Sequence, residues 1–166
     1  MTDAPARPVS AAALGAAALV LAAWIGAALL AVAVVAPAAF GALPSRTLAG
    51  AVVGRVLNAV FLSGIAMSLV VAALCRFGPG VRGASAASLS AAAASAAVWF
   101  MVDPRIARLR ERVGGPVDAL AVDDARRVAF GRLHGYSVGG LGIAMLASAV
   151  ALLIILGALR PGRRSA

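Results

Sequence analysis

Four stretches of apolar residues, each bounded by charged or helix-breaking residues, constrain what this chain can fold into. They cover residues 11–36, 56–75, 84–102 and 136–159. About 20 residues at roughly 1.5 Å each span the hydrocarbon core of a bilayer. In hydrocarbon a single segment satisfies its own backbone hydrogen bonds only as a helix. The sequence therefore predicts an all-α fold, an integral membrane four-helix bundle, with a single transmembrane domain over residues 1–166.

The composition fits a membrane location. Apolar residues make up 63% of the chain, against roughly 45–50% in soluble domains. The net charge is +9 and every one of the 15 basic residues is Arg. Nucleic-acid-binding proteins cluster such residues on an exposed face, whereas here they flank the apolar stretches, at the level of lipid headgroups. We therefore expect membrane lipid and no nucleic acid as partner, in a multi-pass protein of the plasma (inner) membrane.

The connections before and after the second stretch predict its boundaries. Residues 37–44 begin and end with Pro and are expected to break the first helix. Ser45 or Thr47 can cap the next helix, which would leave Arg55 about two turns inside it. Gly78, Pro79 and Gly80 form a tight turn, so we expect the second and third helices to be antiparallel neighbours. The first stretch is too long for the apolar part of a signal peptide and is expected to remain as a helix.

The long link between the third and fourth stretches predicts a short amphipathic helix over residues 104–113. Apolar and basic side chains alternate there on two faces: Ile106, Leu109 and Val113 on one, and Arg105, Arg108 and Arg112 on the other. This helix either lies at the headgroups or extends the third helix. Residues 114–116 end it. A second run begins at Val117, pairs Asp123 with Arg127, and leads into the fourth helix.

Small residues predict close packing of the helices. Gly50 and Gly54 have the four-residue spacing typical of tight helix contacts in membranes, as do Gly135 and Gly139. Trp24 and the nearby Gly26 are also interpreted as helix-packing residues.

The sequence lacks the residues that several common cofactor and catalytic sites require. His134 is the only histidine and Cys75 the only cysteine, which excludes a bis-histidine haem site and a thiol pair within this chain. The sequence contains no HExxH, GxxxxGK[ST] or GxSxG motif. The four apolar stretches contain no Asp, Glu, Lys or Arg. We therefore expect a protein that is not an enzyme and has no cofactor.

Polar residues at the helix ends form the candidate site. Arg127, His134 and Ser137 share one face of the fourth helix with Phe130. Arg55 and Asn58 lie at the start of the second apolar stretch, Arg55 directly before it, and Asp103 directly follows the third. One interpretation is a polar pocket at one membrane interface, with His134 able to titrate or bind a metal. The other is interfacial anchoring and an ion pair.

Motifs spread over most of the chain carry a family resemblance. They are Ala23-Trp24-Ile25-Gly26, then Pro37, Phe40, Leu43-Pro44, Gly50 and Arg55, then Asp103-Pro104-Arg105, and finally Phe130-Gly131-Arg132-Leu133-His134-Gly135-Tyr136-Ser137. In order and spacing the chain resembles the TMEM205-like (DUF4149) membrane proteins. The resemblance implies a four-span fold without an established activity. Vertebrate members are associated with resistance to a platinum drug, which implies export or membrane handling of metal compounds.

Two functional hypotheses follow. The first is a non-catalytic membrane protein that packs with lipid, with a second copy of itself or with a partner protein. It rests on the small-residue helix faces and the absence of charge within the apolar stretches. The second is a transporter or efflux-associated subunit for metal compounds or amphiphiles, which requires the polar residues to converge in space.

Overall fold

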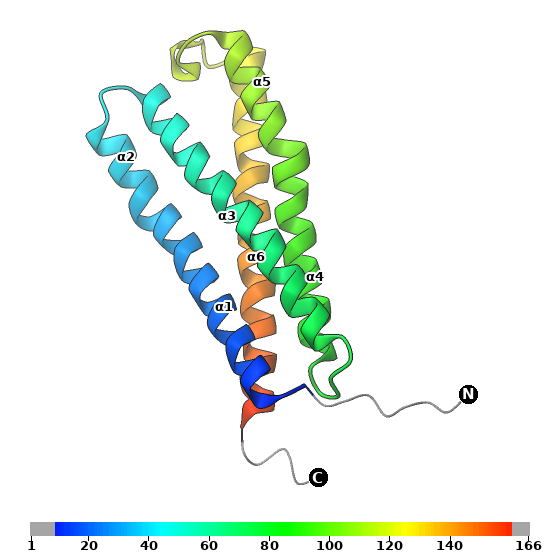
Figure 1. Cartoon of the computed structure of the whole chain (residues 1–166). Helices are drawn as coiled ribbons and strands as arrows, with labels where there is room; N and C mark the ends of the chain where they lie inside the picture. Colours follow the sequence, from blue (N-terminus) through cyan, green and yellow to red (C-terminus); the bar gives the residue numbers. More distant parts are fainter. Residues whose placement is uncertain (1–8, 161–166) are drawn as a thin grey trace.

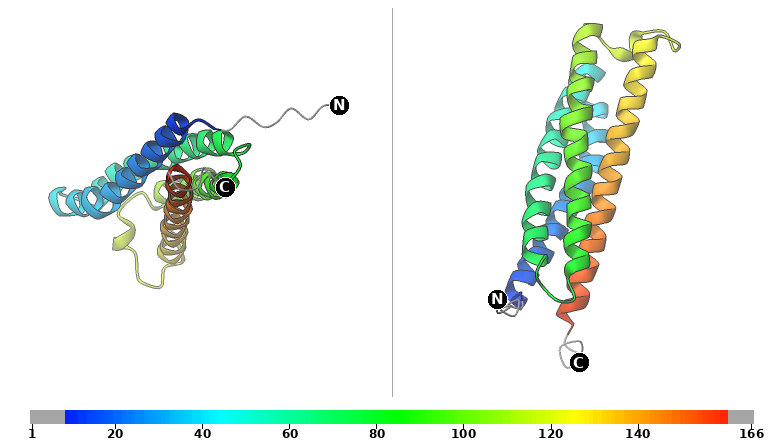
Figure 2. Two further views of the ribbon diagram at one scale, coloured as in Figure 1. Left: turned by 90° about the horizontal axis from the view of Figure 1, so that it is seen from below. Right: turned by 90° about the vertical axis from the view of Figure 1, so that its right-hand side faces the viewer.

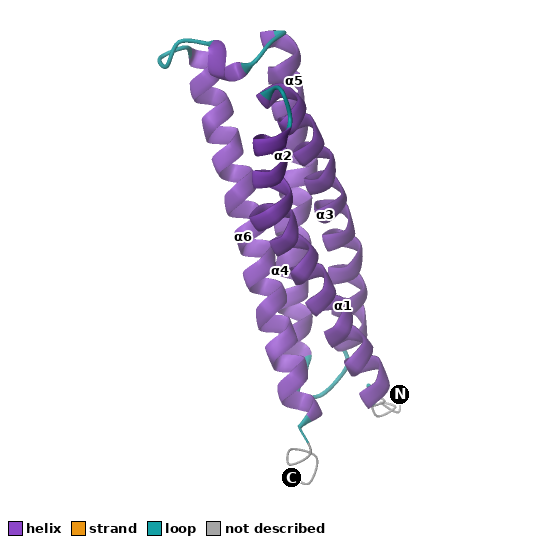
Figure 3. Cartoon of the chain, turned by 90° about the vertical axis from the view of Figure 1, so that its left-hand side faces the viewer, coloured by secondary structure: helices purple, strands orange, loops and turns teal. Residues whose placement is uncertain are grey.

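The computed structural model describes residues 9–160, which are helical and contain no strand. Four helical rods dominate these residues: Ala11–Ala42, Arg46–Cys75, Arg82–Val113 and Ala125–Leu159 (Figures 1 and 3). Each is long and apolar enough to cross a membrane. The predicted all-α four-helix bundle is confirmed, and the chain has the form of a multi-pass membrane protein.

The rods alternate in direction along the chain. The start of α1 (Ala11–Leu30), the turn after α3 (Arg46–Cys75) and the end of α6 (Ala125–Leu159) lie at one end of the bundle. The connections 43–45 and 114–124 lie at the other, named here the link end. α3, α4 (Arg82–Ala97) and α6 run side by side, whereas α2 (Ala36–Ala42) diverges from α6 at the link end (Figures 1 and 2).

The prediction that residues 37–44 break the first helix is wrong for the beginning of this segment. The helix continues through Pro37 to Ala42, and only then does the chain turn, with Ser45 Oγ accepting a hydrogen bond of 3.2 Å from the Leu48 N–H. A π-helical turn at Ala31–Val35 precedes the proline. Proline lacks an N–H and its ring crowds the carbonyl four residues earlier. The wider π turn relieves this crowding, so the helix tolerates Pro37.

The third rod also has a π turn just before a proline. A π turn at Val98–Val102 precedes Pro104, and α5 (Asp103–Val113) then continues the helix beyond the apolar stretch. Of the two alternatives left by the sequence, the amphipathic segment therefore extends the third helix. Gly114 ends it in the left-handed conformation, at φ 66°, which glycine adopts without steric cost.

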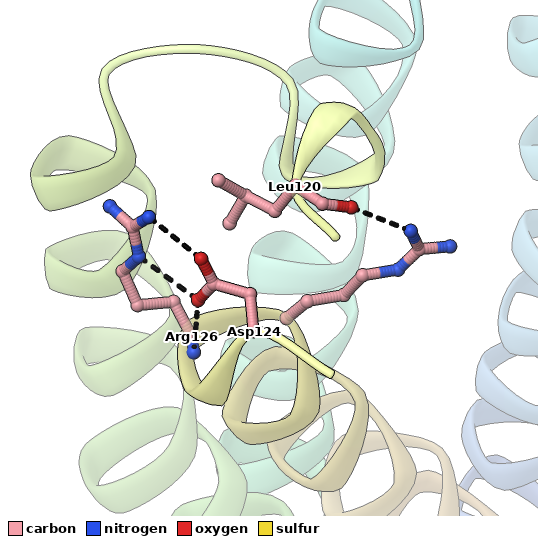
Figure 4. Close-up of polar contacts among 4 residues, drawn as sticks. Leu120, Asp124 and Arg126 are labelled. Atoms are coloured by element: carbon pink, nitrogen blue, oxygen red, sulfur yellow. Dashed lines mark hydrogen bonds and ion pairs between the residues drawn. The ribbon is translucent and has the colours of Figure 1, made fainter. Parts of the chain in front are cut away.

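The link between α5 and α6 differs from the prediction. Residues 117–119 form a short 3-10 turn and α6 begins only at Ala125, so Asp123 and Arg127 are not one helical turn apart on a helix. Asp124 is the cap instead, with its carboxylate accepting from the backbone and side chain of Arg126 (Figure 4). These hydrogen bonds lower the pKa of Asp124 to about 2. The cap is therefore charged at ordinary pH, and its contribution to stability is lost only as the pH falls towards 2.

The core divides into two apolar clusters with hydroxyl groups between them. Leu21, Val71 and Ile155 belong to the cluster towards the termini, and Phe61 and Val98 to the cluster towards the link end. Along α4 and α6, three fully buried serines lie between the residues of the two clusters: Ser88, Ser95 and Ser148. Their hydroxyl oxygens have no hydrogen-bond partner among the described residues.

Candidate functional site

A cavity of about 690 Å³ opens at the link end. Its wall includes Phe40 of α2, residues of α3 from Arg46 to Asn58, the inner face of α5, the start of the link, and the first part of α6. All four rods therefore contribute to it. A volume of this size is in the range of small-molecule sites in proteins.

The structure brings five of the six predicted polar residues to this cavity. They are Arg55, Asn58, Asp103, His134 and Ser137. Arg127 is not part of the wall. It donates to the Leu120 carbonyl oxygen at 2.8 Å and ties the link to α6 (Figure 4).

Arg110 of α5 lines the cavity. The half-buried side chain crosses to α3, where it donates to the Gly50 carbonyl oxygen at 3.3 Å. A Cβ atom at Gly50 would lie 3.1 Å from this guanidinium, and one at Gly54 would lie 3.7 Å from it. Within the chain, the small-residue pair Gly50 and Gly54 thus accommodates an arginine side chain.

Aromatic rings of α6 form the opposite side of Arg110. The Arg110 guanidinium lies 5.4 Å from the centre of the Phe130 ring, a cation–π geometry. The Phe130 and His134 rings are parallel, with centroids 6.3 Å apart. Arg110 therefore links α5 to α3 through the Gly50 backbone and to α6 through the Phe130 ring, beside which the His134 ring lies.

The charges on the wall are only partly compensated. Arg46 and Asp118 form an ion pair at 3.1 Å, and Asp103 interacts with Arg110 through space, without an ion pair within 4.0 Å. Arg55 has neither a hydrogen bond nor an ion pair through its side chain among residues 9–160. Three guanidinium groups face two carboxylates, so the cavity carries positive charge.

The depth of the cavity follows from where the apolar stretches end. The second stretch begins directly after Arg55, the third ends directly before Asp103, and the fourth begins just after His134. Stretches of about 20 residues fill the hydrocarbon thickness, so these three side chains lie at one edge of it. The lengths of the stretches therefore predict that the cavity lies where lipid headgroups meet acyl chains.

The remaining packing residues have different surroundings. Trp24 is buried, donates from its indole N–H to the Val60 carbonyl oxygen at 2.9 Å, and covers Gly64, where a Cβ would lie 2.7 Å from the ring. A Cβ atom added at Gly26, Gly135 or Gly139 would meet no atom within 4 Å beyond its own helix turns. Contact of these three glycines with a second copy or a partner stays a prediction.

Metal-binding groups do not gather in the described part of the chain. No three His, Cys, Asp or Glu side chains among residues 9–160 are placed to hold a metal ion. His134 lines the cavity with an exposed ring beside Phe130.

Sequence reasoning missed Arg110, although a signal for it exists. Arg110 follows Ile106 by four residues and Asp103 by seven, so it shares their helix face. That face becomes the cavity wall once α5 extends the third helix. The sequence prediction assigns the basic face of this segment to Arg105, Arg108 and Arg112, which do not line the cavity.

The comparison with protein families agrees with this architecture. The family model described as "Domain of unknown function (DUF4149)" matches residues 19–114. The chain belongs to the DUF4149 family. The matched part of this DUF4149 protein contains Arg55, Asn58, Asp103 and Arg110, whereas Phe130 and His134 lie beyond it. The predicted resemblance at residues 130–137 therefore stays a prediction. No curated protein and no solved structure matched the chain.

Proposed function

We propose that this DUF4149 protein is a non-catalytic membrane protein that binds amphiphilic molecules of the bilayer in the link-end cavity. The observation that carries the proposal is a cavity whose wall is charged and apolar at once, at the ends of the apolar stretches. An amphiphile presents the same combination of a polar head and an apolar tail. Lipid is thus the partner that we expect, in the plasma (inner) membrane.

The wall offers groups for both parts of such a molecule. Arg55 and Asn58 are polar and exposed, and Ile106 and Leu57 supply apolar surface beside them. Beyond the cavity, the outer faces of the helices are apolar; Leu146 and Leu153 of α6, for example, are 70% and 68% exposed. A tail leaving the cavity would therefore meet a continuous apolar environment.

Photolabelling tests this proposal. The full chain, reconstituted in neutral phosphatidylcholine vesicles, is exposed to a phosphatidylcholine analogue with a photoactivatable group near its headgroup. We expect labelled peptides to come mainly from the cavity wall of α3 and α5. Ala107→Trp, which places a large side chain on that wall, should remove most of this labelling.

A lipid-facing variant provides the matched control. Leu146→Trp adds the same side chain to the outer face of α6 and should leave the labelling of the cavity unchanged. Labelling spread evenly over all lipid-facing peptides, and insensitive to Ala107→Trp, would contradict the proposal.

An efflux-associated role is the second candidate. The fully buried hydroxyls of Ser88, Ser95 and Ser148, between two apolar clusters, support it because they supply polar groups within the bundle. A deletion strain, complemented with wild type or His134→Ala, would be tested for cell-associated metal compounds and amphiphiles. Accumulation of one compound that only wild type corrects would favour efflux. Unchanged content across the compounds would favour binding alone.

A further inference from the structure

The link-end cavity combines two cationic side chains that no carboxylate of the described residues neutralises by direct contact. The Arg110 guanidinium lies against the α3 backbone at Gly50 and Gly54, and Arg55 follows in the same turn of α3. Neither Arg55 nor Arg110 forms an ion pair within 4.0 Å in residues 9–160. Both line one cavity, so an anion within it is attracted by both.

The hydrogen-bonding capacity of Arg110 is only partly used. Its one hydrogen bond among the described residues goes to the Gly50 carbonyl oxygen. A guanidinium carries several further N–H donors in a planar fork, and this fork matches the oxygens of a carboxylate or phosphate. The Phe130 ring holds one face of the guanidinium, so its orientation is restrained before any ligand binds.

We propose that the cavity binds the phosphodiester of an acidic phospholipid, such as phosphatidylglycerol, between Arg55 and Arg110. The inference rests on the proposed function and names the ligand class of the same site. The depth of Arg55, at the start of an apolar stretch, corresponds to the level at which lipid phosphates meet hydrocarbon. Basic pockets between membrane helices are suited to anionic headgroups for this reason.

The surroundings disfavour a zwitterionic headgroup. Arg46 lines the cavity beside Thr47, and the Phe130 ring there already faces the Arg110 guanidinium. Asp118 is paired with Arg46. Three guanidinium groups on the wall outnumber its two carboxylates. A choline or ethanolamine group would therefore meet net positive charge, whereas the uncharged glycerol of phosphatidylglycerol would not be repelled.

Binding of short-chain lipids to the purified full chain tests the proposal. The protein in neutral detergent is titrated with short-chain phosphatidylglycerol or phosphatidylcholine, and bound lipid is counted by native mass spectrometry. We expect phosphatidylglycerol to bind on the order of tenfold more tightly, because the phosphodiester is common to both lipids and only the choline ammonium is repelled by the guanidinium groups. Arg55→Gln should reduce this preference, and Arg55→Gln with Arg110→Gln should abolish it.

Two controls separate binding from folding and from general charge. Arg82→Gln removes an exposed arginine at the opposite end of the bundle and should leave the preference unchanged. Arg55 has no side-chain partner among residues 9–160, so Arg55→Gln should keep the thermal stability of wild type. It tests the site even if loss of Arg110 disturbs the fold.

The outcomes distinguish the two proposals. Equal binding of both lipids, or a preference unaffected by Arg55→Gln and by the double variant, would overturn the headgroup inference and leave amphiphile binding standing. Binding of neither lipid, together with failed photolabelling, would overturn both. Glycerol phosphate that competes as well as the lipid would overturn the lipid as source, because a free phosphate would then be the ligand.

Discussion

Buried serine hydroxyl groups in this bundle differ in whether they have a hydrogen-bond partner. Ser85 of α4 donates to the Ala72 carbonyl oxygen of α3 at 2.9 Å. Ser88, one turn later, is fully buried and has no partner among the described residues. An unsatisfied buried hydroxyl costs about 1–3 kcal/mol, whereas an interhelical hydrogen bond in a membrane contributes about 0.6 kcal/mol on average.

We therefore expect Ser85→Ala and Ser88→Ala to have different effects on the thermal stability of the protein. Ser85→Ala should lower the thermal unfolding temperature in detergent, because it removes the bond between α3 and α4. Ser88→Ala should leave it unchanged or raise it, because it removes a buried hydroxyl that has no hydrogen-bond partner among the described residues. Circular dichroism of the purified chains measures both, and equal losses for the two variants would contradict the interpretation.

At the scale of the element, the rotation of each helix decides which small residues matter. On α6, a Cβ at Gly139 would meet no atom within 4 Å, whereas a Cβ at its neighbour Gly140 would clash with the side chain of Val98, in the π turn that follows α4. The spacing in the sequence singles out Gly139 together with Gly135. Gly135 and Gly139 have the spacing of a packing motif. In this chain, however, Gly140, on a different face of α6, makes the close contact with the neighbouring rod.

Neighbouring alanine substitutions on α6 test this. Gly140→Ala should destabilise the bundle, because either α4 or the Val98 side chain must shift. Gly139→Ala should have no such effect and should favour the helix slightly, since alanine has the higher helix propensity. Thermal unfolding compares the two. A larger loss for Gly139→Ala would indicate that its face is covered by a second copy of the chain.

At the scale of the whole molecule, four rods place the two kinds of connection on opposite sides of the bilayer. Phe77 lies in the turn after α3 and Val122 lies in the link before α6. Both are well exposed, at 58% and 78%. The native cysteine, Cys75, is buried and can be replaced by alanine in a labelling background.

We expect Phe77→Cys and Val122→Cys, each in the Cys75→Ala chain, to react from opposite sides. A membrane-impermeant maleimide applied to intact cells should label one of them, and inverted vesicles should give the reverse pattern. Either orientation agrees with the fold. Labelling of both from the same side would contradict a four-span arrangement.

The sequence by itself determined the class of fold and the membrane spans, because the length of an apolar stretch and the residues that bound it are local properties. It also identified Arg55, Asp103 and His134, since charged and polar residues at the ends of spans must lie at the membrane edge. Only the tertiary structure decided that the helix passes through Pro37, that Arg110 lies on Gly50, and that Gly140 rather than Gly139 meets the neighbouring rod. These features depend on how helices rotate and cross, which packing between distant residues sets and no short stretch of sequence encodes.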